Sequence, residues 1–68
     1  MDAKKLGKRI KLARIELDMT QEGLAEAIKA KQKSISRYET GASLPSLETL
    51  EKISIVLQKP FGYFLDAT

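Results

Sequence analysis

The stretch KAKQKSISRYETG, residues 29 to 41, combines side chains that suit hydrogen bonding with nucleobases. Five of its first nine residues are Lys, Arg or Gln, and none of the nine is acidic. We expect Ile35 to face a core. Helical geometry then places Gln32, Ser36 and part of Arg37 on the outside. A Gln amide matches an adenine edge, an Arg guanidinium forks onto guanine, and Ser can pair with either. On charge alone, an ordinary solvated face remains the simpler interpretation.

The composition excludes several kinds of chemistry. The chain has 68 residues with no cysteine and no histidine, so it has neither a disulfide framework nor a Cys/His zinc site. It also lacks a glycine-rich phosphate loop and a clustered acidic pair in a recognisable pocket setting. We therefore expect no catalytic residue, no cofactor and no metal, and the chain is not expected to be an enzyme.

Positive charge is concentrated in the first two thirds of the chain. The net charge is +3, with ten Lys and Arg residues before position 46 and two after it. A one-signed stripe on a small domain is typical of a surface that binds a polyanion. No apolar run approaches the roughly 20 residues of a membrane span, and no signal peptide is recognisable. These features predict a soluble, cytoplasmic protein with no membrane partner.

Apolar periodicity and cap residues predict five short helices and no strand. Their expected ranges are 3 to 18, 21 to 28, 32 to 40, 43 to 58 with its start at Pro45 and Ser46, and 60 to 67. Thr20 is expected to cap the second helix, and Gly41 to end the third in a left-handed conformation. The sequence thus predicts an all-α fold, a compact bundle in one domain spanning residues 1–68.

Apolar residues at helical spacing predict the core. The side chains expected to face inward are Leu6, Ile10, Ala13, Leu17, Leu24, Ala25, Ile28, Ile35, Tyr38, Leu47, Leu50, Ile53, Val56, Leu57, Phe61, Phe64 and Leu65.

The segment MTQEGLAEAIKAKQKSISRYETG, followed by PSLETLEKI, resembles the helix-turn-helix of the lambda repressor, Cro and XRE-like family. The resemblance covers essentially the whole chain. It implies a sequence-specific, double-stranded DNA-binding regulator, in which the helix at about 32–40 enters the major groove. It also implies two-fold dimers on a palindromic site.

The same resemblance implies roles for individual residues. The groove-facing positions, where base contacts are expected, are Lys31, Gln32, Lys33, Ser36 and Arg37. The positions expected near the DNA backbone are Thr20, Gln21, Ser34, Thr40 and, with Ala42 in the following loop, Ser43. Arg14 and Glu39 are expected to form an ion pair beneath this surface.

The chain departs from the family pattern at three places. Lys29 stands where the turn between the second and third helices usually carries glycine, which suggests backbone strain there. Gln58 and Lys59 replace a glycine and an apolar residue in the loop before the last helix. Leu12 and Ile15 occupy positions that are commonly polar, so they are either scattered surface residues or a patch for a partner.

A dimer contact is expected at the end of the chain. The last helix carries four large apolar side chains in five positions, and a helix that short cannot bury all of them. With Phe61, Phe64 and Leu65 inward, Tyr63 is expected on the outside, so we expect a homodimer interface at Tyr63, Phe61 and Lys59. Leu12 and Ile15 are the next candidate surface.

The resulting hypothesis is a transcriptional repressor of prokaryotic or phage type that acts as a homodimer. The alternative is a helix-turn-helix adaptor or antitoxin-type protein whose main partner is another, unknown protein. The salt dependence of DNA binding would separate the two, because phosphate contacts weaken steeply as salt rises and an apolar interface does not.

Overall fold

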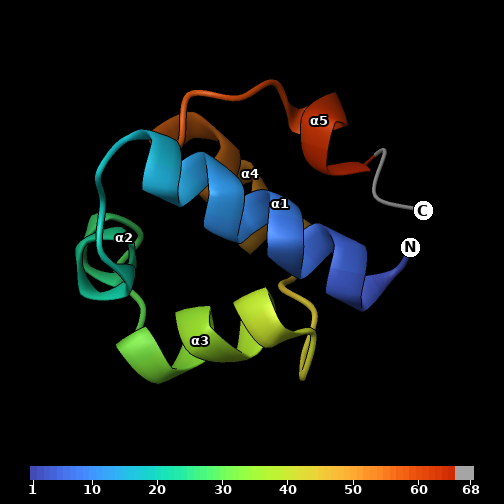
Figure 1. The fold of residues 1–68 in the computed structure, drawn as a ribbon, viewed down its shortest axis with the longest axis horizontal. Helices are drawn as coiled ribbons and strands as arrows, with labels where there is room; N and C mark the ends of the chain where they lie inside the picture. The colour runs from blue at the N-terminus through green and yellow to red at the C-terminus, as the bar shows by residue number, and fades with distance from the viewer. Residues whose placement is uncertain (66–68) are drawn as a thin grey trace.

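The computed structural model describes residues 1–65, and every regular element among them is a helix (Figure 1). The helices are α1 (Ala3–Glu16), α2 (Gln21–Ala27), α3 (Gln32–Thr40), α4 (Leu47–Val56) and α5 (Phe61–Leu65). The all-helical bundle predicted from the sequence is confirmed. The expected bounds of the third helix agree with α3. The first helix is two residues shorter than expected, and residues 66 and 67 of the expected last helix lie outside the described part.

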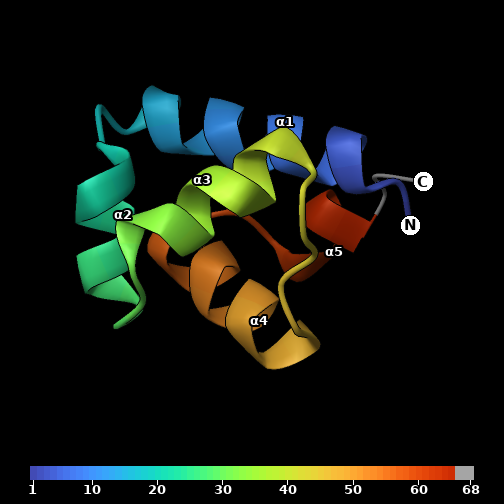
Figure 2. The same cartoon turned by 90° about the horizontal axis from the view of Figure 1, so that it is seen from below.

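One apolar core joins all five helices. Its buried members are Leu6, Ile10, Ala13, Leu24, Ala25, Ile28, Ile35, Leu50, Ile53, Leu57 and Phe64. α1 packs along α3, α3 packs against α2, and α5 closes the core beside α4 and α1 (Figure 1). Figure 2, which views the molecule from below, places α3 in front, with α1 along one edge and α4 along the opposite edge.

Three apolar residues expected in the core are exposed instead. Leu17 lies beyond the last turn of α1, at its C-cap, and Leu47 is the first residue of α4, one turn before the buried Leu50. Leu65 is the last residue of α5. Each lies at a helix end, where periodicity continues in the sequence but no neighbouring element covers the side chain.

The ring of Tyr63 is also not where it was expected. It is half-buried and packs against the core, with an edge-to-face contact of 5.0 Å between its centroid and that of Phe64. The guanidinium of Arg9 and the ammonium of Lys59 lie 5.2 and 5.0 Å from the Tyr63 centroid, and Arg9 Nη1 donates to the Tyr63 carbonyl at 2.6 Å. The ring therefore helps to hold α5 on α1.

Side-chain caps fix where the helices begin. Thr20 Oγ1 accepts from the Gly23 amide at 2.9 Å, and Ser46 Oγ accepts from the Thr49 amide at 3.1 Å, so both expected start signals are confirmed. Asp2, which sequence reasoning missed, caps α1 by accepting from the amides of Lys4 and Lys5. The hydrogen bond from the Lys5 amide is the main reason that the pKa of Asp2 is lowered from its ordinary value of 3.8.

Three helices end in the same way, on a residue with a left-handed backbone. Asp18, Lys29 and Gln58 have φ values of 53°, 59° and 59°. Behind Lys29, the Ala30 amide donates to Ala25 and the Lys29 amide to Glu26, which is the Schellman pattern, and equivalent bonds close α1 and α4. The strained turn expected at Lys29 is confirmed. α3 ends on Gly41 at φ 83°, also as expected.

Gly7 allows α1 to lie very close to α3. A Cβ built on Gly7 would stand 2.5 Å from the carbonyl oxygens of both Tyr38 and Glu39. No side chain fits at that distance, so the contact between the two helices depends on this glycine. It sets the position of α3 relative to the rest of the domain.

Candidate nucleic-acid interface

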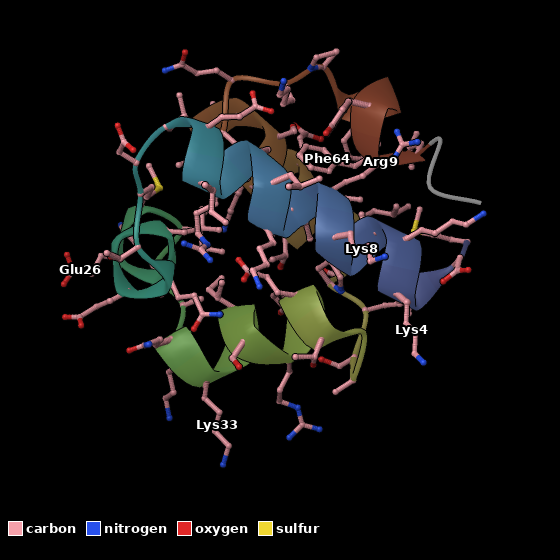
Figure 3. All side chains as sticks on the ribbon, in the orientation of Figure 1. Lys4, Lys8, Arg9, Glu26, Lys33 and Phe64 are labelled. Atoms are coloured by element: carbon pink, nitrogen blue, oxygen red, sulfur yellow. The ribbon has the colours of Figure 1, made fainter. Side chains whose placement is uncertain are left out.

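One face of α3 points away from the molecule and carries polar and basic side chains. Ile35 is fully buried and fixes the inner side of the helix. Gln32, Lys33 and Arg37 are exposed, and Ser36 is half-buried. The Lys33 side chain extends away from the body of the protein (Figure 3). The face expected to read bases is therefore brought together on the outside of α3.

Lys31 stands at the entry to this face. It is the N-cap of α3, it is exposed, and its side chain makes no capping hydrogen bond to the helix. The first amides of α3 thus lack the side-chain cap that Thr20 and Ser46 provide for α2 and α4. Uncapped donors with a nearby lysine are suited to an anion.

Beneath the outer face, a buried ion pair connects α1 to α3. Arg14 Nε donates to Glu39 Oε2 at 2.7 Å, and Arg14 Nη2 donates to Glu39 Oε1 at 3.1 Å. A third guanidinium bond, from Nη1, reaches the carbonyl of Met19 at 2.7 Å. The two side chains are only 11% and 3% exposed. A two-pronged pair in this setting holds α3 in one orientation.

Gln21 extends this network to the start of α2. Its Nε2 donates to Glu39 Oε1 at 3.1 Å, so the carboxylate of Glu39 is bonded to residues from two other segments. Gln21 was expected near the DNA backbone, and Thr20 directly precedes it as the exposed cap of α2. The position of the α2 N-terminus is consequently coupled to that of α3.

The other end of α3 leads into the connection to α4. Thr40 Oγ1 and the Ser43 amide both donate to the Arg37 carbonyl, each at 3.3 Å. Thr40 is exposed, and Ser34 and Ser43 are half-buried. Four of the residues expected at the DNA backbone thus flank α3 in the sequence, with Thr20 and Gln21 before it and Thr40 and Ser43 at its end and after it.

The charges of this surface are not neutralised within the described residues. The ion pairs there join Arg14 to Glu39, Lys52 to Glu48 and Lys59 to Glu16. Lys31, Lys33 and Arg37 take part in none of them. Their charge is available to a partner, and a run of unopposed cations on one helix is suited to phosphates.

The described part of the chain, residues 1–65, holds no group of three or more acidic side chains placed to bind a metal ion. Nor does any of its helices combine the length and the apolar character needed to cross a membrane.

Two short helices joined by a tight turn, with the outer face of the second one free and basic, define a helix-turn-helix domain. Residues 10–64 match the family HTH_3, described as helix-turn-helix. The chain is 34% identical over 61 residues to an uncharacterized HTH-type transcriptional regulator of Sinorhizobium medicae, with 90% of this chain and 44% of that protein covered. The chain therefore belongs to the Cro/C1-type, XRE-like helix-turn-helix family of transcriptional regulators, which is not a family of enzymes. It spans less than half the length of the curated relatives that it matches.

Solved structures share the fold. PlcR of Bacillus thuringiensis, in complex with the peptide PapR7 and DNA, is 40% identical with a TM-score of 0.89, over 96% of this chain and 23% of that one. The restriction-modification controller protein C.AhdI of Aeromonas hydrophila is 24% identical with a TM-score of 0.88, over 93% of this chain and 96% of that one. The second likeness concerns the fold alone.

Proposed function

We propose that residues 1–68 form one domain that binds double-stranded DNA sequence-specifically and represses transcription from prokaryotic or phage-type promoters. Two copies bind a palindromic operator, and each places α3 in a major groove. Repression then requires only that the bound dimer covers a promoter. A protein with this role works in the cytoplasm, on the nucleoid.

The observation that carries this proposal is the outer face of α3. It presents Gln32, Lys33 and Arg37 without an acidic neighbour, and the Arg14–Glu39 pair holds it from below. A rigid helix narrow enough for the major groove, with side chains that match base edges, is the arrangement that direct readout requires.

The residues divide into two roles. Gln32, Ser36 and Arg37 contact base edges and choose the sequence, and Lys31 and Lys33 add base or phosphate contacts at the same groove. The backbone contacts come from Thr20, Gln21, Ser34, Thr40 and Ser43, which set the register of the domain on the duplex without reading sequence. PlcR, whose structure includes DNA, shares 40% of its aligned residues with this chain and supports the proposal.

Selection of bound duplexes from a random pool tests sequence specificity and symmetry together. We expect an enriched palindrome with half-site centres about 34 Å apart along one face of the duplex. Arg37→Ala should lose one base preference in each half-site, whereas Lys11→Ala, a change at an exposed position on α1, should leave the motif intact. Failure to enrich any sequence would reject sequence-specific binding.

Leu12 and Ile15 favour a second function, as a protein-binding adaptor. These two α1 residues are 56% and 49% exposed. If the main partner is a protein held by these residues, DNA binding should be weak and Leu12→Asp should abolish partner binding. If DNA is the partner, affinity should fall steeply as salt rises. The slope of log affinity against log salt concentration should be about −0.9 for each phosphate contact.

A further inference from the structure

The outer side of α4 carries the two most exposed large apolar side chains in the described part of the chain. Leu47 is 66% exposed and Ile55 is 70% exposed. They are eight residues apart with Glu51 midway, so they share one side of the helix and stand about 12 Å apart along it. Two aliphatic side chains displayed this openly at both ends of one short helix are not explained by the core of a single copy.

An open, mostly apolar pocket lies at the Ile55 end of this side. Its volume is about 300 Å³, and its walls are Ala27, Ile28 and Lys29 at the end of α2, with Lys52, Ile55 and Val56 of α4. Lys29, one of the two lysines in this lining, is exposed.

Charges on the same side are arranged in a complementary way. Glu48 stands next to Leu47, and two lysines, Lys29 and Lys52, border the pocket beside Ile55. Within one copy, Lys52 and Glu48 are only loosely paired, at 4.0 Å, with 57% and 85% of their side chains exposed. Both are therefore available to a partner. One end of α4 offers an aliphatic side chain with a carboxylate, and the other end offers an apolar pocket with ammonium groups.

We propose that this side of α4 is the contact between two copies of the chain. The two α4 helices pack antiparallel about a two-fold axis near Glu51. Leu47 of each copy enters the pocket of the other beside Ile55, and Glu48 meets Lys29 and Lys52 there. Such an isologous contact requires that one surface contain both complementary halves, and α4 does. This inference rests on the proposed function in that the dimer it describes is the one that binds the operator.

The position of α4 suits a pair of recognition helices. In Figure 2, α3 faces the viewer and α4 runs along the edge opposite α1. A two-fold axis along that viewing direction, just outside α4, therefore leaves both α3 helices on the same side of the dimer. The Cα extents of one copy are 27, 23 and 20 Å, so two copies that touch along α4 can hold their recognition helices about 34 Å apart.

The contact is small, which sets its expected strength. One aliphatic side chain and a few charges from each copy make a patch well below the roughly 1,200 Å² of a stable complex, so the dimer is weak without DNA. Two Glu51 carboxylates also meet near the axis and oppose it. Replacing Glu51 by Leu removes this repulsion and completes an apolar stripe from Leu47 to Ile55, and we expect dimer affinity to rise at least tenfold.

Because the chain contains no cysteine, engineered disulfides test the geometry directly. In an antiparallel pair, position 47 of one copy faces position 55 of the other. We expect the double variant Leu47→Cys/Ile55→Cys to form covalent dimers under mild oxidation, and each single variant to stay largely monomeric. Leu12→Cys/Ile15→Cys is the matched control, with two similarly exposed positions on α1. Equal cross-linking in the control, or none in the α4 double variant, would overturn the proposal.

Sedimentation and DNA binding separate this proposal from the function on which it rests. Glu51→Leu should raise the dimer fraction without DNA across a concentration series, and unchanged masses would count against the contact. Leu47→Asp should lower affinity for a duplex with two half-sites at least tenfold and leave affinity for a single half-site unchanged. Strong binding by both Leu47→Asp and the parent chain to the two-site duplex would reject the α4 contact alone. If the parent chain bound no duplex at all, the DNA-binding function itself would be rejected instead.

Discussion

Removing one partner of the buried Arg14–Glu39 pair should cost a large share of the stability of this small domain. Arg14→Met deletes three hydrogen bonds at once, two to the Glu39 carboxylate and one to the Met19 carbonyl. It leaves a carboxylate that is only 3% exposed with the Gln21 amide as its remaining partner. Glu39→Gln is milder, because an amide oxygen still accepts from Arg14.

The magnitude follows from burial. Breaking a buried pair by removing one partner costs about 3–5 kcal/mol, because the other charge is left uncompensated. A chain of 68 residues has a total stability of about 3–10 kcal/mol at the usual 0.05–0.15 kcal/mol per residue. Arg14→Met should therefore remove most of the stability. Glu39→Gln should cost about 1–3 kcal/mol, and the double variant should cost about 2 kcal/mol less than the sum, since no charge is left unpaired.

Urea unfolding of the parent chain, the two single variants and the double variant, followed by circular dichroism, measures this coupling. A stabilising osmolyte in all four samples keeps Arg14→Met folded at the start of the titration. Lys59→Met and Glu16→Gln form the matched control, because that pair is 3.2 Å apart but its side chains are 27% and 57% exposed. Its coupling should stay below about 1 kcal/mol. Similar additivity in both cycles would refute the reasoning that burial gives the Arg14–Glu39 pair its importance.

Gly7→Ala should lower the free energy of unfolding by about 2 kcal/mol or more, seen as a lower urea midpoint, because the new Cβ would meet backbone oxygens at 2.5 Å. An unchanged midpoint would mean that α1 and α3 can separate freely. Lys29→Gly should stabilise by up to about 1 kcal/mol in the same assay, since φ there is 59°, and a lower midpoint would show that chain entropy outweighs the strain. Arg37→Ala should relax one base preference by about 1–3 kcal/mol, whereas Lys33→Ala should weaken all duplexes alike, and binding titrations on mismatched sites distinguish the two. Because the pKa of Asp2 is lowered in the folded state, its contribution to stability is complete above pH 3.8 and is lost as the pH falls through the lower pKa of the folded protein. Asp2→Asn should therefore flatten this part of the acid-unfolding curve.

The face of α3 could be predicted because its determinants are local. Ile35 fixes the inner side, Gly41 ends the helix at φ 83°, and the acid-free run between them marks the outer side. The hydrogen bond from Gln21 to Glu39 could not be predicted in this way, because it depends on how α2 and α3 pack across eighteen positions of sequence. Pattern reasoning assigned Gln21 to DNA and left this second partner out.

The left-handed turn residues and the close contact at Gly7 could be predicted from the sequence only in part. Only the family resemblance, which places glycine at both positions, points to special turns at Lys29 and Gln58. It gives no such signal at Asp18, although the φ of 53° there closes α1 in the same way. Gly7 gave a local signal that was not used. A glycine inside a helix costs about 1 kcal/mol relative to alanine, so its presence among the apolar positions of α1 indicates a close approach by another backbone.

α4 shows why periodicity alone cannot separate a core from an interface. The segment from Leu47 to Leu57 has apolar residues at 47, 50, 53, 55, 56 and 57, so several sides of the helix are apolar. The structure buries Leu50, Ile53 and Leu57 and leaves Leu47 and Ile55 outside. An apolar side chain at both places lowers the free energy only when something covers it, and in a single copy nothing does. The excess of apolar residues in α4 is therefore an argument for a second copy, which periodicity can indicate only after the core has been located.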